Sequence, residues 1–75
     1  MKTDIIHSRR EKVAEILLSA RVQKGLTQEQ LGEKVGFAQN TIARIENCRF
    51  SPNADQLYAL CEALDLNIKI NETKI

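Results

Sequence analysis

Residues 27–47 have the sequence TQEQLGEKVGFAQNTIARIEN, whose pattern predicts two short helices joined by a tight turn. Thr27 and Gln30 have the spacing of a capping box, in which two side chains accept hydrogen bonds from backbone N–H groups of the first turn. Gly36 stands where the first helix should end, in the left-handed conformation that closes many helices. The second helix is expected over residues 38–47. The apolar positions that would pack the two helices across each other are Leu26, Leu31, Val35, Ile42 and Ile45.

A longer helix is expected before this stretch. Ser8 and Glu11 match the capping box, and apolar residues follow them at helical spacing. This pattern predicts a helix from residue 9 to residue 23 or 24, with Gly25 as its C-cap. The preceding segment, Asp4–His7, is short and compatible with either a brief strand or a frayed end.

The next predicted helix follows the stretch. Asn53 is its expected N-cap and Gln56 stands at the capping-box position. We expect this helix to end near residue 64 or 65. Cys61 lies on its apolar stripe, which predicts a small core residue rather than a reactive thiol.

The periodicity then changes from helical to period two. Leu66, Ile68 and Ile70 alternate with polar residues, which predicts a strand of about five residues. A lone strand needs a pairing partner, and the candidates are Asp4–His7 of the same or a neighbouring chain, or the same strand of a second copy. Either arrangement favours a homodimer, and two-fold dimers are the commonest oligomers.

Length and composition predict one small domain, residues 1–75, with a core over 8–65 and a dimerisation strand at 66–71. The chain has no apolar run long enough for a membrane span and no visible signal peptide, so we expect a cytoplasmic protein. Two cysteines and one histidine without metal-ligand spacing predict no zinc site or other metal site. No cofactor-binding loop, nucleophile-plus-base pair or carboxylate cluster is present, which argues against an enzyme.

The second helix of the opening stretch has two faces. Ile42 and Ile45 define the side expected to be buried, and Glu46 falls close to it. Because a buried carboxylate needs a partner, we predict that Glu46 pairs with Arg21, which lies on the apolar stripe of the preceding helix. The alternative is that both side chains point into solvent. The opposite face carries Asn40, Ala43, Arg44 and Asn47.

From residue 21 to residue 64 the chain resembles the Cro/repressor (XRE-type) helix-turn-helix family. The resemblance rests on Arg-x-x-Lys-Gly-Leu-Thr-Gln-x-x-Leu at 21–31, on Val-Gly at 35–36, on Ile-x-x-Ile-Glu-Asn at 42–47 and on the helix after Pro52. Two positions depart from the family, because Ala38 replaces the usual Ser or Thr N-cap and Cys48 replaces a usual Gly. The implied fold is mainly α, a four-helix bundle with a short C-terminal β-strand that pairs in a dimer.

The resemblance implies that helix 38–47 enters the major groove of double-stranded DNA, and that a homodimer binds a palindromic operator. It places Ala38, Gln39, Asn40 and Arg44 at base-contacting positions. It places Gln28, Thr41, Asn47 and Arg49 at phosphate-contacting positions, and Lys24 is a further phosphate candidate from its charge. Asn, Gln and Arg have the right chemistry to read adenine and guanine, although polar residues on a helix face are more often merely solvated.

The net charge is only +1, which is weak evidence for binding to nucleic acid.

The C-terminal strand in place of a fifth helix resembles the HipB-like antitoxin branch of the family. This branch implies an alternative function, a protein-interaction module that binds a toxin protein and represses its own operon. The sequence thus leaves two function classes, a transcriptional regulator and a toxin-binding module.

Overall fold

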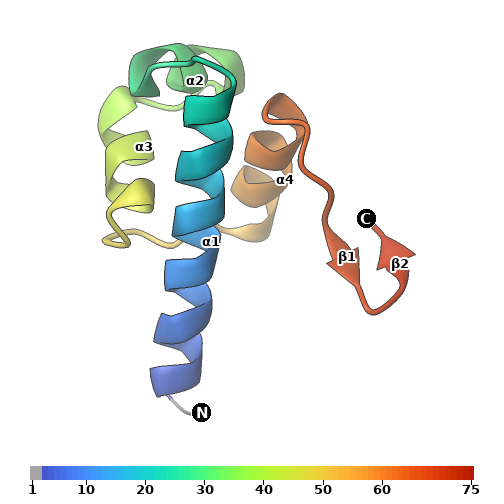
Figure 1. The fold of residues 1–75 in the computed structure, drawn as a ribbon. Helices are drawn as coiled ribbons and strands as arrows, with labels where there is room; N and C mark the ends of the chain where they lie inside the picture. Colours follow the sequence, from blue (N-terminus) through green and yellow to red (C-terminus); the bar gives the residue numbers. More distant parts are fainter. Residues whose placement is uncertain (1–2) are drawn as a thin grey trace.

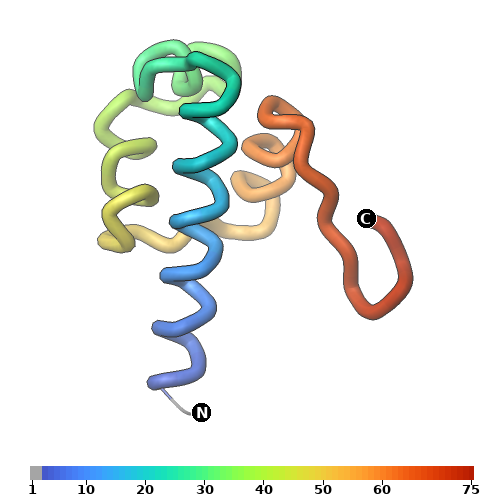
Figure 2. The backbone as a smooth tube through the Cα atoms, viewed as in Figure 1, coloured from blue at the N-terminus to red at the C-terminus, as the bar shows by residue number. Residues whose placement is uncertain are grey.

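The computed structural model describes residues 3–75, which form four helices and one two-stranded antiparallel sheet (Figure 1). Helices α3 and α4 flank α1 on opposite sides, and α2 crosses the end of the bundle where α1 finishes (Figures 1 and 2). The β-hairpin lies beyond α4, on the side away from α3. The elements are α1 (Thr3–Gln23), α2 (Gln28–Val35), α3 (Gln39–Glu46), α4 (Ala54–Ala63), β1 (Lys69–Ile70) and β2 (Thr73–Lys74).

The core lies where the four helices meet. Leu31 of α2, Ile42 of α3 and Leu60 of α4 are its most deeply buried large side chains, each at most 2% exposed. The inward positions predicted for helix 38–47 are therefore confirmed, because Ile42 and Ile45 are both buried. Cys61 also belongs to this cluster, as predicted. Its burial raises the pKa of the thiol, which keeps it protonated.

The start predicted for the first helix is wrong. Helix α1 already includes Thr3, and Ser8 lies inside it instead of capping it. No Gly or Pro interrupts the chain before Ser8, and Asp4 in the first turn suits the positive end of the helix dipole. His7 and Glu11 also face each other one turn apart, with 3.4 Å between Nε2 and Oε1. The strand considered for Asp4–His7 does not form, since this segment is helical.

Two capping boxes form as predicted. The Thr27 hydroxyl accepts a hydrogen bond from the Gln30 N–H at 3.0 Å, and the Gln30 carboxamide accepts one from the Thr27 N–H at 2.9 Å. Asn53 and Gln56 repeat this arrangement at the start of α4. Helix α3 begins differently, because its N-cap Ala38 supplies no side-chain hydrogen bond.

Each helix is followed by a residue in the left-handed conformation. Gly25 and Gly36 occupy this position after α1 and α2, as predicted. Cys48 and Asp65 occupy it after α3 and α4, with φ of 58° and 57°. Such values are strained for residues with a side chain. After α4, the Leu66 N–H donates to the carbonyl of Cys61 at 2.8 Å, which completes a Schellman motif and turns the chain out of the helix.

Gly32 lies in the interior of α2 because there is no room for a side chain. A Cβ atom there would stand 2.5 Å from the carbonyl oxygen of Phe37. The nearest atom belongs to the turn that precedes α3. Gly32 therefore allows the turn between α2 and α3 to be tight.

The C-terminal strand is shorter than predicted and has a different partner. Only Lys69–Ile70 is in β-structure, and it pairs antiparallel with Thr73–Lys74 of the same chain. Asn71, with φ of 52°, lies in the intervening turn. Leu66 and Ile68 are half-buried and pack against the core, which explains their alternation with polar residues without a longer strand.

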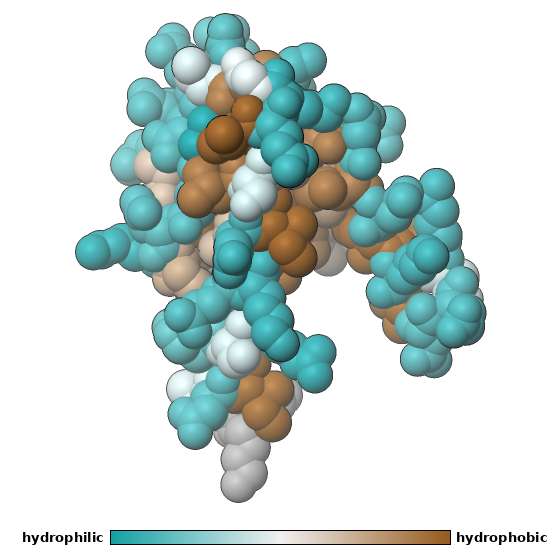
Figure 3. Space-filling model, in the orientation of Figure 1, coloured by the Kyte–Doolittle hydropathy of each residue, from teal (hydrophilic) through white to brown (hydrophobic). Residues whose placement is uncertain are grey.

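Apolar residues are unevenly distributed over the surface. Figure 3 shows hydrophilic residues over the side of α2 and α3, and brown patches along α1 and beside the hairpin. No helix within residues 3–75 is long and apolar enough to cross a membrane. The most exposed large apolar side chains are Ile5, Ile16, Val22, Ile70 and Ile75.

Candidate nucleic-acid interface

The outer face of α3 presents polar side chains to solvent. Gln39, Asn40 and Arg44 are all exposed, and Ala38 at the helix start is exposed beside them. Because the buried side of α3 packs on the core through Ile42 and Ile45, the helix is fixed with this face outward. The structure thus brings together the four residues expected to contact bases.

The residues expected to contact phosphates surround this helix at different depths. Asn47 and Arg49 are exposed at the end of α3 and in the turn after it. Thr41 is half-buried within α3, and Gln28 is half-buried at the start of α2. Four of the five predicted phosphate contacts therefore belong to α3, its following turn or the neighbouring α2.

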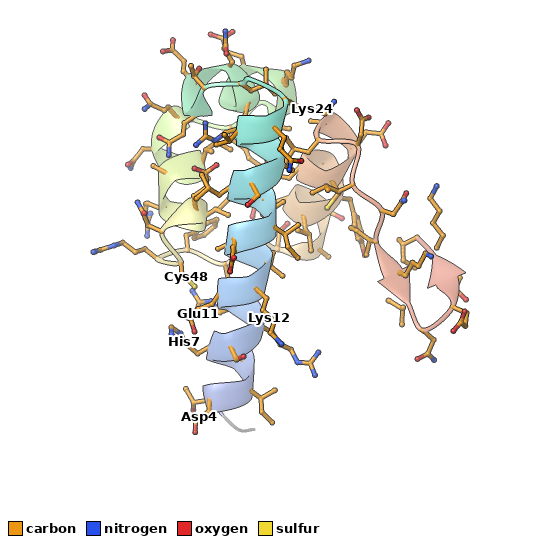
Figure 4. The ribbon with its side chains drawn as sticks, viewed as in Figure 1. Asp4, His7, Glu11, Lys12, Lys24 and Cys48 are labelled. Atoms are coloured by element: carbon orange, nitrogen blue, oxygen red, sulfur yellow. The ribbon has the colours of Figure 1, made fainter. Side chains whose placement is uncertain are left out.

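The fifth, Lys24, lies elsewhere. Figure 4 shows Lys24 at the end of α1 beside α4, on the side away from α3. Its Nζ forms an ion pair with the carboxylate of Asp65, which follows α4. The hydrogen bond and charge of Lys24 lower the pKa of Asp65 below its ordinary value. The structure does not bring Lys24 together with the other candidates.

The predicted contact between Arg21 and Glu46 is present. Arg21 Nε donates to Glu46 Oε2 at 2.6 Å and Nη2 donates to Oε1 at 3.0 Å, so the pair is bidentate. The two side chains are only 13% and 4% exposed. Gln28 adds a hydrogen bond from its Nε2 to Glu46 Oε1 at 3.0 Å. Glu46 therefore joins α1, α2 and α3 and fixes the two helices of the motif to the rest of the bundle.

This network also shapes the charge of the interface. Glu46 is the acidic residue of α3, and its carboxylate is turned inward and neutralised by Arg21. The outward face of α3 consequently carries amides and the positive charge of Arg44. Such a face suits polyanionic DNA, because amides can pair with base edges and a guanidinium with guanine or phosphate.

Sequence reasoning missed a contact between Arg44 and Phe50. The guanidinium carbon of Arg44 lies 5.6 Å from the centroid of the Phe50 ring, which is within the range of a cation–π interaction. Phe50 belongs to the turn after Cys48, visible at the end of α3 in Figure 4. A Schellman turn at Cys48, the usual Gly position of the resembled family, would have been the signal that the chain folds back toward α3.

Within residues 3–75, no group of three or more His, Cys, Asp or Glu side chains is placed to hold a metal ion. The exposed side chains of α3 offer hydrogen-bond donors, hydrogen-bond acceptors and the positive charge of Arg44.

Comparison with known proteins agrees with this geometry. The helix-turn-helix family model matches residues 17–70, which include all of α2, α3 and α4. An uncharacterized HTH-type transcriptional regulator, y4dJ of Sinorhizobium fredii, is 38% identical over 47 residues, which are 63% of this chain and 61% of that protein. An uncharacterized HTH-type transcriptional regulator of Methanothermobacter thermautotrophicus is 41% identical over 44 residues, which are 59% of this chain and 64% of that protein.

The chain thus spans a little under two thirds of the length of these two relatives. No solved structure matches it significantly. The matched family model covers more than half of the chain, and the structure has the two helices and tight turn that define the motif. The chain therefore belongs to the XRE-type helix-turn-helix family.

Proposed function

We propose that this protein is a sequence-specific DNA-binding transcriptional regulator that inserts α3 into the major groove of DNA. The observation that carries the proposal is the outward face of α3. Gln39, Asn40 and Arg44 are exposed there, while Ile42 and Ile45 anchor the same helix to the core. Its membership of the helix-turn-helix family and the names of its two relatives support the same conclusion.

Within this proposal the residues divide into two groups. Gln39, Asn40 and Arg44 contact base edges. Ala38, at the start of the helix, packs against the bases. Phosphates are contacted by Gln28, Thr41, Asn47 and Arg49, which lie around the same helix. We assign Lys24 the smallest part, since its ammonium group is paired with Asp65 away from α3.

The proposed functional unit is a homodimer acting as a repressor on a palindromic operator, with two copies of α3 about one turn of DNA apart. The segment 66–71 is a candidate contact between the copies. Ile70 is 67% exposed on β1 and Ile75 is 59% exposed after β2. An isolated two-stranded hairpin is only marginally stable in water, so a second copy that covers these side chains would stabilise it.

DNA binding is tested by selection from a random pool of duplexes, followed by a gel shift with the enriched sequence. Arg44→Ala and Gln39→Ala should abolish selective binding while the circular dichroism spectrum stays unchanged. The matched control is Arg9→Ala, which removes the same charge from an exposed site on α1. Retained selective binding by both α3 variants would show that α3 does not read DNA.

The phosphate contacts predict a strong dependence on salt, because each neutralised phosphate releases a bound counterion. Removing one contact, as in Arg49→Ala, should make the negative slope of the logarithm of the binding constant against the logarithm of the salt concentration less steep by about 1. This variant should weaken binding to all sequences by a similar factor. A slope equal to that of the unmodified protein would remove Arg49 from the interface.

The role of the hairpin is tested by sedimentation of the chain truncated after Asp65. Loss of the dimer, with the helical circular dichroism signal retained, is the expected result. A truncated chain that still sediments as a dimer would place the main contact elsewhere.

A further inference from the structure

Arg21 of α1 and Arg44 of α3 differ in what their guanidinium groups contact. Arg21 donates to both carboxylate oxygens of Glu46 and to the carbonyl oxygen of Leu26, so each of its three guanidinium nitrogen atoms is engaged. Among residues 3–75, no hydrogen bond or ion pair engages the guanidinium of Arg44, whose neighbour is the ring of Phe50. When a guanidinium stacks on an aromatic ring, the contact uses the face of the guanidinium and leaves its N–H groups free.

The backbone after α3 holds Phe50 beside Arg44. Cys48 is in the left-handed conformation, with φ of 58°, and reverses the direction of the chain. The N–H groups of Arg49 and Phe50 then both donate to the carbonyl oxygen of Arg44, at 2.8 and 3.2 Å. Phe50 is therefore bound to the backbone of the same residue whose side chain lies over its ring.

The ring itself is anchored. Phe50 is half-buried and, like Leu57 of α4, packs against the hydrophobic core that includes Ile45 of α3. A fixed ring restricts the conformations of the long Arg44 side chain, whose rotamer freedom would otherwise be lost only when DNA binds.

We propose that Phe50 is a positioning residue for DNA recognition, which holds the Arg44 guanidinium toward the major groove with its N–H groups free for a guanine. This inference rests on the proposed function, because it deepens the role of Arg44 in that site. The two parallel N–H groups of arginine match O6 and N7 of guanine, which is the commonest specific contact to this base. A carboxylate in the place of Phe50 would also attract Arg44, but it would occupy these donors.

The competing explanation is that Phe50 only anchors the turn. The two explanations differ in what a substitution changes. An anchor affects stability, and it affects binding to all DNA sequences alike. A positioning residue affects the preference for guanine at one base pair, and only while Arg44 is present.

The test compares Phe50→Leu, which keeps an apolar side chain but removes the ring, with Phe50→Tyr, which keeps the ring. Selection from a random duplex pool identifies the operator, and Arg44→Ala identifies the base pair whose guanine preference depends on Arg44. Dissociation constants are then measured for duplexes with G·C or A·T at that position. Phe50→Leu should reduce the ratio of the two constants about two- to fivefold, and Phe50→Tyr should retain it.

The same comparison in the Arg44→Ala background provides the control, because there Phe50→Leu should not change the ratio further. An unchanged ratio in Phe50→Leu would overturn the inference while leaving DNA binding intact. Absence of any enriched sequence for the unmodified protein would instead overturn the proposed function, and the inference with it.

A measurement without DNA tests the contact itself. The side-chain δ protons of Arg44 should resonate upfield in the NMR spectrum if the guanidinium next to them stays over the Phe50 ring, and this shift should disappear in Phe50→Leu. An ordinary chemical shift in the unmodified protein would show that the contact does not persist in solution, which would also overturn the inference.

Discussion

Arg21 of α1 and Glu46 of α3 form a bidentate ion pair between residues 25 positions apart in the chain. The pair is largely shielded from solvent, and Gln28 and the Leu26 carbonyl satisfy further hydrogen-bonding groups of the two side chains. The ion pair can be buried because each charge is balanced by the other and both side chains are hydrogen-bonded. The pair thus sets the position of the recognition helix relative to α1.

The first prediction follows from the asymmetry between removing one charge and removing both. Arg21→Ala should lower the free energy of unfolding by about 3–5 kcal/mol, because it leaves the Glu46 carboxylate buried without its counter-ion. Urea denaturation followed by circular dichroism measures this loss. Since a domain of this size has only a few kcal/mol of stability, the experiment is best done at low temperature.

The control for this prediction is the double variant Arg21→Met with Glu46→Leu, which removes both charges and keeps apolar volume. It should be more stable than Arg21→Ala, because no buried charge is left unpaired. The single variant Arg21→Met keeps the same apolar volume but leaves Glu46 without its counter-ion; if it is as stable as the double variant, an unpaired charge does not explain the loss.

The second prediction concerns the tight turn between α2 and α3. Gly32→Ala places a methyl group 2.5 Å from the carbonyl oxygen of Phe37. A backbone atom cannot move aside as a side chain can, so the variant should lose about 1–3 kcal/mol, despite the better helix propensity of alanine. The exposed neighbour offers the control, since Glu33→Ala should change stability by at most about 0.5 kcal/mol. Thermal unfolding gives the melting temperatures of the two variants. Equal melting temperatures would contradict the prediction.

Local sequence rules were sufficient for the centre of the chain. The bounds of α2, both of its capping residues and the Arg21–Glu46 contact follow from capping chemistry and helical periodicity. These features depend on residues close together in sequence, or on two helices whose buried faces are both evident. The exposure of Asn40 and Arg44 follows from the same periodicity.

The same rules failed where a sequence pattern is compatible with two different structures. The spacing of Ser8 and Glu11 fits a capping box, but it is equally compatible with the middle of a helix. Alternation at Leu66, Ile68 and Ile70 fits a strand, yet packing of extended chain on the core produces the same period. The Arg44–Phe50 contact depends on the turn at Cys48, a conformation that the residue type does not favour.

The third prediction uses the start of α3, whose N-cap residue offers no side-chain acceptor, unlike those of α2 and α4. Ala38 is exposed and its backbone is extended, with φ of −65° and ψ of 147°, which is the conformation that an N-cap needs. Ala38→Ser should therefore add about 1 kcal/mol of stability, which raises the melting temperature by about 4–8 °C for a domain of this size. Ala38→Val is the matched control without a hydroxyl group. If both variants melt at the same temperature, the missing cap is not what limits α3.

The last prediction concerns the ion pair between Lys24 and Asp65, which joins the end of α1 to the residue after α4. The pKa of Asp65 is lowered in the folded protein, mainly by the hydrogen bond and charge of Lys24. The carboxylate therefore stabilises the fold at pH values above its ordinary pKa of 3.8. This contribution is lost as the pH falls through the lower pKa of the folded state.

Lys24→Ala should raise the pKa of Asp65 toward the ordinary value, which NMR titration of the carboxyl group measures directly. The gap in melting temperature between the unmodified protein and Lys24→Ala should be constant near neutral pH and should close below about pH 4. Lys34 also lowers this pKa, but as the weakest of the causes. Lys34→Ala is therefore the matched control and should shift the titration of Asp65 less. A larger shift in Lys34→Ala than in Lys24→Ala would mean that the ion pair is not maintained in solution, and that the field of the surrounding charges sets the titration of Asp65.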